Sequence, residues 1–128
     1  MADTATIKVV DASALVAVVF DEPAGDQVAD LIRDCELVAP SLLRFEMANV
    51  CWAKIRRNPE QRDALVAAFH MPGIVVETLD VDHQAVLQLA LQTGLTTYDA
   101  SYLWLARNLV IELVTLDRQL GAAVETAP

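Results

Sequence analysis

Two aspartates follow predicted strands directly, at positions where ligands often bind. Asp11 follows the apolar run IKVV, and Asp117 follows ELVTL. Open parallel sheets bind ligands beyond the carboxyl ends of their strands, so both carboxylates would point into that region. Each aspartate could instead cap the helix that follows it, and for a single aspartate capping is the more common role. Finding two of them makes a functional role about as well supported as a capping role.

Two further acids lie in predicted helices. Glu46 is inside the apolar helix SLLRFEMANVCWAKI and shares a face with Asn49, three residues later. A glutamate there is either a surface residue or faces a positive group, because burying its charge without a partner is costly. Asp99 opens the segment TTYDASYLWLARN, where a first-turn acid also suits the helix dipole. The apolar residues after Asp99 predict that it is held at the edge of the core.

Hydroxyl and amide side chains near these acids are candidate supporting groups. Thr115 precedes Asp117 by two residues, and in a strand that spacing puts both side chains on the same face. Ser13 follows Asp11 by two residues, although it could serve only as a helix cap. Together with Asn49, these residues are expected to orient carboxylates or bound water, as the outer partners of metal ligands do.

The chemistry open to these four acids is that of a hard divalent cation. An all-oxygen ligand set suits Mg²⁺ or Mn²⁺, and the sequence has no histidine cluster that would favour zinc. His70 and His83 are isolated and receive no role. Four carboxylates in one cleft raise one another's pKa, so we expect at least one to be protonated or turned away when no cation is bound.

The elements that must position the acids alternate between strand-length and helix-length patterns, which is typical of an α/β fold with a parallel sheet. Strands are expected at residues 7–10, 36–39, 74–79 and 112–116. Helices are expected at residues 13–20, 24–33, 41–56, 59–70, 82–94 and 99–107, followed by a last helical turn. Ser41 and Asp82 are expected N-caps, and Gly94 is an expected C-terminal stop. A fifth strand at Val124 and Glu125 could complete the sheet.

Length and composition fit one compact domain, residues 1–128, with a hydrophobic fraction of 55%. The longest apolar run, residues 14–20, is far too short to cross a membrane, and the N-terminus lacks the features of a signal peptide. We therefore expect a cytoplasmic protein. Cys35 and Cys51 fit that compartment as reduced and mostly buried thiols.

The net charge of −9, taken as an average, argues against a nucleic-acid binder. Acids gathered around a cation would contribute to that charge while forming a site that the metal neutralises. Basic residues are also unevenly placed, and five of the nine fall in one short stretch that could contact phosphates: Arg44, Lys54, Arg56, Arg57 and Arg62.

Four segments of the chain resemble the PIN-domain ribonucleases in order and placement: VVDASAL, LLRFEMANV, TTYDASYLWLA and LVTLD. The chain most resembles the VapC-like toxins of bacterial toxin–antitoxin systems, from about Ile7 to Leu120. TTYDASYLWLA is the most specific of the four segments. The tail after Asp117 is shorter than this family's pattern, so the final strand is expected to be reduced or absent.

This resemblance implies a three-layer α/β/α fold with a short parallel sheet of four or five strands. It implies an acidic site made of Asp11, Glu46, Asp99 and Asp117, with Thr115 or Ser13 assisting. If one ion binds, Asp11 and Asp99 would be its first ligands. The implied activity is endonucleolytic cleavage of RNA with Mg²⁺ or Mn²⁺. The implied partners are an identical subunit and a small antitoxin that covers the site.

Aromatic residues could also meet the RNA. Tyr98 could stack on a base in an unpaired loop, or it could face the core. Trp52 and Trp104 are expected to be core or dimer contacts. A cation bound at the acids would activate a water molecule and polarise the phosphate.

Two other interpretations of the sequence remain open. The acids could be caps and surface charges in a non-catalytic binding module, or the protein could be a housekeeping RNA-processing nuclease.

A haloacid-dehalogenase-type phosphatase is disfavoured, because it needs an aspartate where Ser13 stands. A phosphate-accepting receiver domain would need an acidic pair near the first strand and a lysine after a late strand, and the sequence has neither. A dinucleotide enzyme would need a glycine-rich turn after that strand, and no glycine is present there.

Overall fold

A four-stranded parallel sheet lies at the centre of the computed structural model, which describes residues 6–126. The strands are β1 (Thr6–Val10), β2 (Cys35–Pro40), β3 (Val76–Leu79) and β4 (Glu112–Val114), in the order β3-β2-β1-β4. β1 lies between β2 and β4, with Val9 opposite Val38 on one side and Leu113 on the other. Val9 and Val10 are fully buried, as the continuous apolar sequence of a central parallel strand predicts.

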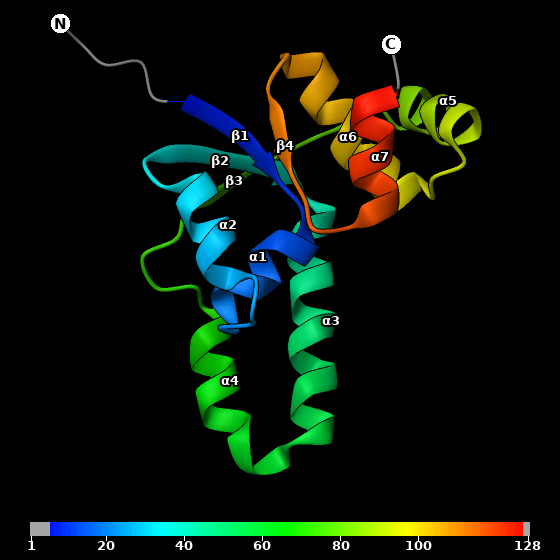
Figure 1. Cartoon of the computed structure of the whole chain (residues 1–128). Helices are drawn as coiled ribbons and strands as arrows, with labels where there is room; N and C mark the ends of the chain where they lie inside the picture. Colours follow the sequence, from blue (N-terminus) through cyan, green and yellow to red (C-terminus); the bar gives the residue numbers. More distant parts are fainter. Residues whose placement is uncertain (1–5, 127–128) are drawn as a thin grey trace, which may run out of the picture.

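Helices cover both faces of this sheet, which gives the three-layer α/β/α fold (Figure 1). The first group is α1 (Ala12–Val19), α2 (Gly25–Ile32), α3 (Leu42–Arg57), a short 3₁₀ turn (Pro59–Gln61) and α4 (Arg62–Phe69). The second group is α5 (His83–Thr93), α6 (Thr97–Leu109) and α7 (Arg118–Thr126). Right-handed crossovers explain why the two groups of helices lie on opposite faces. The chain moves across the sheet in one direction from β1 through β2 to β3 and in the opposite direction from β3 to β4, so the connecting helices change face.

The strand order creates a switch point between β1 and β4. From β1 the chain goes to β2 on one side, and β4 later joins on the other side. Chains that leave neighbouring strands toward opposite faces open a crevice at the carboxyl ends of those strands. Asp11 follows β1 and Thr115 follows β4, so the topology places both residues at this crevice.

Several expected element bounds are wrong. Val124 and Glu125 lie in α7 and not in a fifth strand. The buried residues of that segment, Leu120 and Ala123, are three apart and so form one helical face. β3 begins at Val76, after a turn in which Met71 and Gly73 have positive φ. β4 ends at Val114, so Thr115 and Asp117 are in a loop, and the strand argument for their shared face does not apply.

Helix starts were predicted with mixed success. Asp82 caps α5 by accepting a hydrogen bond from Ala85 N at 3.0 Å, and Gly94 ends that helix in the left-handed conformation, as expected. Ser41 precedes α3 but makes no capping bond with its side chain. α6 begins two residues before Asp99, because Thr96 is its N-cap. None of the helices within residues 6–126 is long and apolar enough to cross a membrane.

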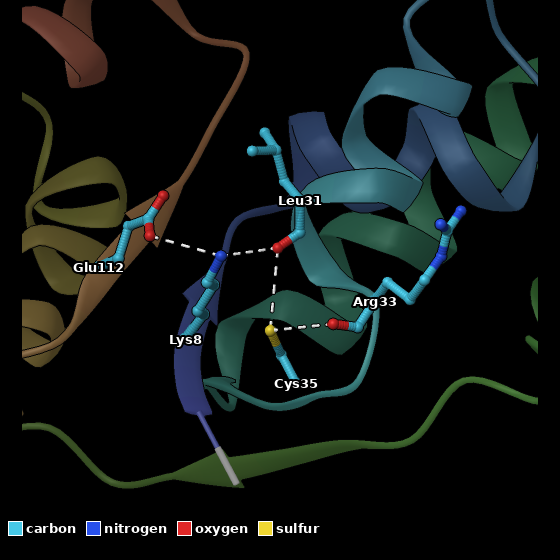
Figure 2. Close-up of polar contacts among 5 residues, drawn as sticks. All are labelled: Lys8, Leu31, Arg33, Cys35 and Glu112. Atoms are coloured by element: carbon cyan, nitrogen blue, oxygen red, sulfur yellow. Dashed lines mark hydrogen bonds and ion pairs between the residues drawn. The ribbon is translucent and has the colours of Figure 1, made fainter.

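A lysine joins three elements at the end of the sheet far from Asp11 (Figure 2). Lys8 Nζ on β1 donates a hydrogen bond of 2.7 Å to Leu31 O on α2 and lies 3.4 Å from a Glu112 carboxylate oxygen on β4. The Cys35 thiol donates to the Arg33 and Leu31 carbonyls, at 3.4 and 3.8 Å. These contacts satisfy carbonyls at the end of α2, where a positive charge is also favoured by the helix dipole.

Gly25→Ala is expected to lower the free energy of unfolding by about 1–3 kcal/mol, because α1 and α2 are in close contact at this glycine. A Cβ at residue 25 would lie 2.4 Å from the backbone oxygen of Ala17. Gly121→Ala on α7 is the matched control, since its Cβ would meet only a Thr115 methyl at 3.9 Å. Helix propensity predicts that the control is more stable than wild type by about 0.5–1 kcal/mol. Urea unfolding of both variants measures the difference, and equal midpoints would contradict the predicted clash.

Candidate active site

Asp11 is almost fully buried at the switch point, with 4% of its surface exposed. Its Oδ1 accepts hydrogen bonds from Ser13 Oγ at 2.8 Å and from Ala14 N at 3.0 Å. Its Oδ2 accepts one from Thr115 Oγ1 at 2.5 Å. The bond from Ala14 N makes Asp11 the N-cap of α1. Capping and a place in the site are therefore compatible roles here, although the sequence presented them as alternatives.

The loop after β4 is attached to the start of α1 through the same hydroxyl groups. Leu116 N donates to Ser13 Oγ at 3.0 Å, and Asp117 N donates to Thr115 Oγ1 at 3.0 Å. The Asp117 carboxylate accepts from Leu120 N at 2.8 Å and so caps α7. Ser13 and Thr115 thus orient the Asp11 side chain and fix the position of Asp117.

Glu46 is half-buried on the second turn of α3 and has a tyrosine as its partner. Tyr102 OH donates a hydrogen bond of 2.5 Å to Glu46 Oε1. Tyr102 lies on α6 and is only 1% exposed, so this bond connects helices on opposite faces of the sheet. Tyr102 was not among the residues predicted from the sequence, although it follows Asp99 by three residues and so lies on the same side of its helix.

Asp99 lies in the first turn of α6 and is partly exposed. Its backbone N–H donates to Thr96 Oγ1 at 3.2 Å, so Thr96 fixes the start of the helix that carries this carboxylate. Thr96 was also missed. The spacing of Thr96 and Asp99, a threonine followed three residues later by an acid, is a known helix-start signature and could have identified it.

The four acids form one electrostatic group, which we call the acidic cluster: Asp11, Glu46, Asp99 and Asp117. Burial raises the pKa of Asp11, Glu46 and Asp99 above their ordinary values. Repulsion from other members adds to each of these shifts, for example from Asp11 and Asp117 onto Asp99. Hydrogen bonds oppose them, with Thr115 lowering the pKa of Asp11 and Tyr102 lowering that of Glu46. Burial and Glu46 together raise the pKa of the Tyr102 phenol, which therefore remains a donor.

The donors of this cluster fit a hard cation. The acidic cluster offers carboxylate oxygens, and Ser13 and Thr115 add hydroxyl oxygens beside it. Such an all-oxygen set suits Mg²⁺ or Mn²⁺. Within residues 6–126, however, no three acidic, histidine or cysteine side chains are arranged to hold an ion as they stand. Because carboxylates without a cation repel one another, the side chains would have to move closer together to bind one ion.

Other predicted residues lie outside this cluster. Asn49 is exposed, one turn beyond Glu46 on α3. Arg44 donates to Val76 O at 3.3 Å, and Lys54 forms an ion pair of 2.8 Å with Glu22. Arg56 stacks on the Trp52 ring, with its guanidinium 5.1 Å from the ring centroid. Lys54, Arg56 and Arg57 lie eight or more residues beyond Glu46 on α3, which is about 12 Å or more along the helix, toward the tip of the α3–α4 hairpin (Figure 1).

The aromatic residues differ in exposure. Tyr98 is 63% exposed next to Asp99, so the alternative of a core-facing tyrosine is wrong. Trp52 is 56% exposed and is not a core residue, whereas Trp104 packs against the core. Tyr98 also lines an apolar cavity of about 460 Å³ at the carboxyl ends of β2 and β3, with Pro40, Leu42, His83 and Leu87.

Known proteins of one family match this chain along most of its length. Residues 8–125 match the PIN domain. The chain belongs to the PIN-domain family. It is 34% identical over 119 residues to Ribonuclease VapC3 of Pyrobaculum aerophilum, a match that covers 88% of this chain and 91% of the relative.

A second relative and a solved structure agree with this assignment. Exonuclease VapC9 of the same organism is 34% identical over 88 residues, which are 65% of this chain and 63% of that protein. The crystal structure of PAE2754 from Pyrobaculum aerophilum superimposes with a TM-score of 0.76 at 29% sequence identity, covering 98% of this chain and 91% of the other. This PIN-domain chain is therefore VapC-like in sequence, and its α/β/α fold is shared with a solved structure.

Proposed function

We propose that this VapC-like protein is an endoribonuclease that hydrolyses RNA phosphodiester bonds with Mg²⁺ or Mn²⁺, and that it is the toxin of a toxin–antitoxin pair. The observation that carries the proposal is the acidic cluster, in which four acids from separate segments share one electrostatic site at the switch point. The name of the relative Ribonuclease VapC3 supports RNA as the substrate. We also propose that the nuclease works in the cytoplasm, the compartment predicted from the sequence.

In this proposal Asp11 and Asp99 are the first metal ligands, and Glu46 and Asp117 complete the set. A bound divalent cation would supply Lewis-acid chemistry, polarising the phosphate and lowering the pKa of a water molecule. Ser13 and Thr115 hold the Asp11 carboxylate in one orientation through bonds of 2.8 and 2.5 Å. Tyr102 holds Glu46, and its hydrogen bond favours the ionised carboxylate that a cation requires. Asn49, exposed one turn beyond Glu46, remains a candidate supporting residue.

The proposed contacts with RNA come from an exposed tyrosine and from the basic residues of α3 and α4. Tyr98 is exposed beside Asp99 and can stack on an unpaired base. Arg44, Lys54, Arg56, Arg57 and Arg62 remain candidates for phosphate contacts. Their positions along α3 and at the start of α4 would suit RNA flanking the cleaved bond better than the cleaved phosphate itself.

The proposed protein partners are a second copy of this chain and an antitoxin that covers the acidic cluster. Exposed apolar side chains on α3 and α5 support self-association, since Phe45 is 80%, Leu91 77% and Leu87 50% exposed. Contiguous exposed apolar patches often mark protein interfaces, and these side chains are candidates for such a patch. Trp52 adds to the exposed apolar surface of α3.

The decisive experiment incubates partner-free protein with total RNA in Mn²⁺, in Mg²⁺ and in EDTA, and maps the RNA ends. Internal cuts that require a divalent cation are the expected result. Progressive shortening from one end would instead match the name of the relative Exonuclease VapC9 and would replace endonuclease with exonuclease in the proposal. Intact RNA under all three conditions would favour a non-catalytic binding module.

Tyr102→Phe is expected to reduce cleavage roughly 10- to 100-fold, the usual effect of losing a partner that orients a metal ligand. The variant keeps the buried ring but loses the hydrogen bond to Glu46, so the pKa of Glu46 rises further. The acidic limb of the pH–rate profile should therefore move to higher pH. Tyr98→Phe is the matched control, because it removes a hydroxyl from an exposed tyrosine. A Tyr102→Phe profile identical to that of the control would rule out this role.

A further inference from the structure

A cavity separate from the acidic cluster lies between α5, α6 and α7, the helices on one face of the sheet (Figure 1). Its volume is about 480 Å³. The polar side chains that line it are those of Gln92, Thr93, Arg107, Gln119 and Thr126. None of the residues that line it is acidic, although the chain has 18 aspartates and glutamates. The electrostatic character of this cavity is therefore opposite to that of the protein as a whole.

Arg107 supplies the charge in this cavity. One of its guanidinium nitrogens, Nη2, is buried and has no hydrogen-bond partner within the described part of the chain. A buried donor without an acceptor is unfavourable, and a charged one more so. Because Nη2 makes no hydrogen bond within the described residues, the guanidinium could turn toward the cavity without losing one at this nitrogen. An acceptor in the cavity would give it a partner.

Beside Arg107, the donors that the cavity can offer to a ligand are the two glutamine amides and not the hydroxyls. The hydroxyls of Thr93 and Thr126 already donate to Leu89 O at 2.8 Å and Ala122 O at 3.0 Å, so their protons are engaged. The amides of Gln92 and Gln119 can each donate to a ligand. A cation with neighbouring amide donors and no acid is the chemistry that recognises an anion with several oxygens.

The position of the cavity selects the kind of anion. Gln119 follows Asp117 by two residues at the start of α7. Arg107 is eight residues after Asp99 on α6, which is about 12 Å along the helix. Two of the three helices that line the cavity, α6 and α7, therefore begin close to members of the acidic cluster. A strand bound across that cluster would place further phosphates over the same helices.

We propose that Arg107, Gln92 and Gln119 bind a phosphate of the RNA substrate other than the one that is cleaved. This inference rests on the proposed function, because it assumes that RNA crosses the acidic cluster. The contact adds substrate affinity on a protein whose average charge repels RNA. It does not take part in the cleavage step.

The test compares steady-state cleavage of a 12-nucleotide single-stranded RNA by wild type, Arg107→Gln and Arg107→Lys at several salt concentrations. Arg107→Gln should raise KM severalfold with kcat nearly unchanged, because it removes binding shared by ground and transition states. The slope of log affinity against log salt should become shallower by about 0.7, the value for one phosphate contact on a single strand. Arg107→Lys should retain most of that slope, because it keeps the charge.

Arg33→Gln is the matched control, since it removes one positive charge from an exposed arginine on the far side of the sheet, next to Asp30. Equal KM and salt slope for Arg107→Gln and Arg33→Gln would overturn the inference while leaving the proposed nuclease intact. Failure of wild type to cut RNA would instead remove the proposed function.

A second pair of variants covers the case in which Arg107→Gln does not fold. Gln92→Glu places a negative charge at the cavity from an exposed position near the end of α5. Gln84→Glu makes the same change at an exposed position near the start of that helix. Gln92→Glu should raise KM more than Gln84→Glu. Equal KM values for these two variants would also overturn the inference.

Discussion

Asp11→Asn is expected to reduce RNA cleavage by at least about 100-fold, the scale at which loss of one preorganised electrostatic group affects catalysis. Asp11 has the most hydrogen bonds of the acidic cluster and is 4% exposed. Asparagine has nearly the same shape and can still cap α1, so the fold should be retained. The substitution removes one charge from the set that would hold a cation. Asp99→Asn should lower the rate on the same scale.

Asp26→Asn is the matched control, because it makes the same chemical change at an exposed position in the first turn of α2. Initial rates at saturating Mn²⁺ measure the effect, and far-ultraviolet circular dichroism confirms that each variant is folded. If both cluster variants kept the rate of Asp26→Asn, the acids would be caps and surface charges only. The same comparison can be made by growth inhibition on expression, in which wild type and Asp26→Asn should be toxic and the cluster variants should not.

The order of the elements was easier to predict from the sequence than the contacts between distant segments. The apolar run before Asp11 identifies a central strand, and the order of elements identifies a parallel sheet. Asp11 could therefore be assigned to the carboxyl end of the sheet from the sequence alone. Fold class and PIN-domain membership are confirmed.

The bond from Tyr102 to Glu46 could not be predicted in this way. It joins residues 56 positions apart on helices from opposite faces of the sheet. The apolar residues after Asp99 predicted only that this helix is largely buried, and they singled out neither Tyr102 nor a partner for it. Pairing of that kind depends on how α3 and α6 approach each other, and local sequence carries no information about the approach.

The end of the chain shows a second limit. Val124 and Glu125 have a strand-like local pattern, but Leu120 and Ala123 are buried on one face of α7. Packing against α6 decides the conformation of this segment, so tertiary contacts override a weak local preference. The basic stretch shows the same limit. Lys54 was predicted to be available for phosphate contacts, but it forms an ion pair with Glu22, which is distant in the sequence.

Mn²⁺ is expected to raise the melting temperature of the wild-type protein, because a cation relieves the repulsion within the acidic cluster. At 100 times its Kd a ligand stabilises the folded state by about 2.7 kcal/mol. For a chain of this length that corresponds to a shift on the order of 10 °C. Differential scanning fluorimetry in EDTA and in excess Mn²⁺ measures this shift.

Burial of the acids, together with the same repulsion, predicts how metal-free stability depends on pH. The pKa values of Asp11, Glu46 and Asp99 are raised in the folded state, so the folded protein binds protons more tightly than the unfolded chain. The contribution of these groups to the free energy of unfolding therefore falls as pH rises from their ordinary values, 3.8 and 4.5, through their raised values. Mn²⁺ binds the ionised form, so its stabilising effect should grow across the same pH window.

Asp99→Asn separates these two effects in one protein. Without metal at neutral pH the variant should melt at a higher temperature than wild type, because one of the repelling charges is gone. With excess Mn²⁺ it should gain far less stability than wild type, because one ligand is gone as well. Such a crossover is expected where a functional site is held at a cost in stability. A variant less stable than wild type in EDTA would show that Asp99 is not strained by its neighbours, and a variant that responds fully to Mn²⁺ would show that Asp99 is not a metal ligand.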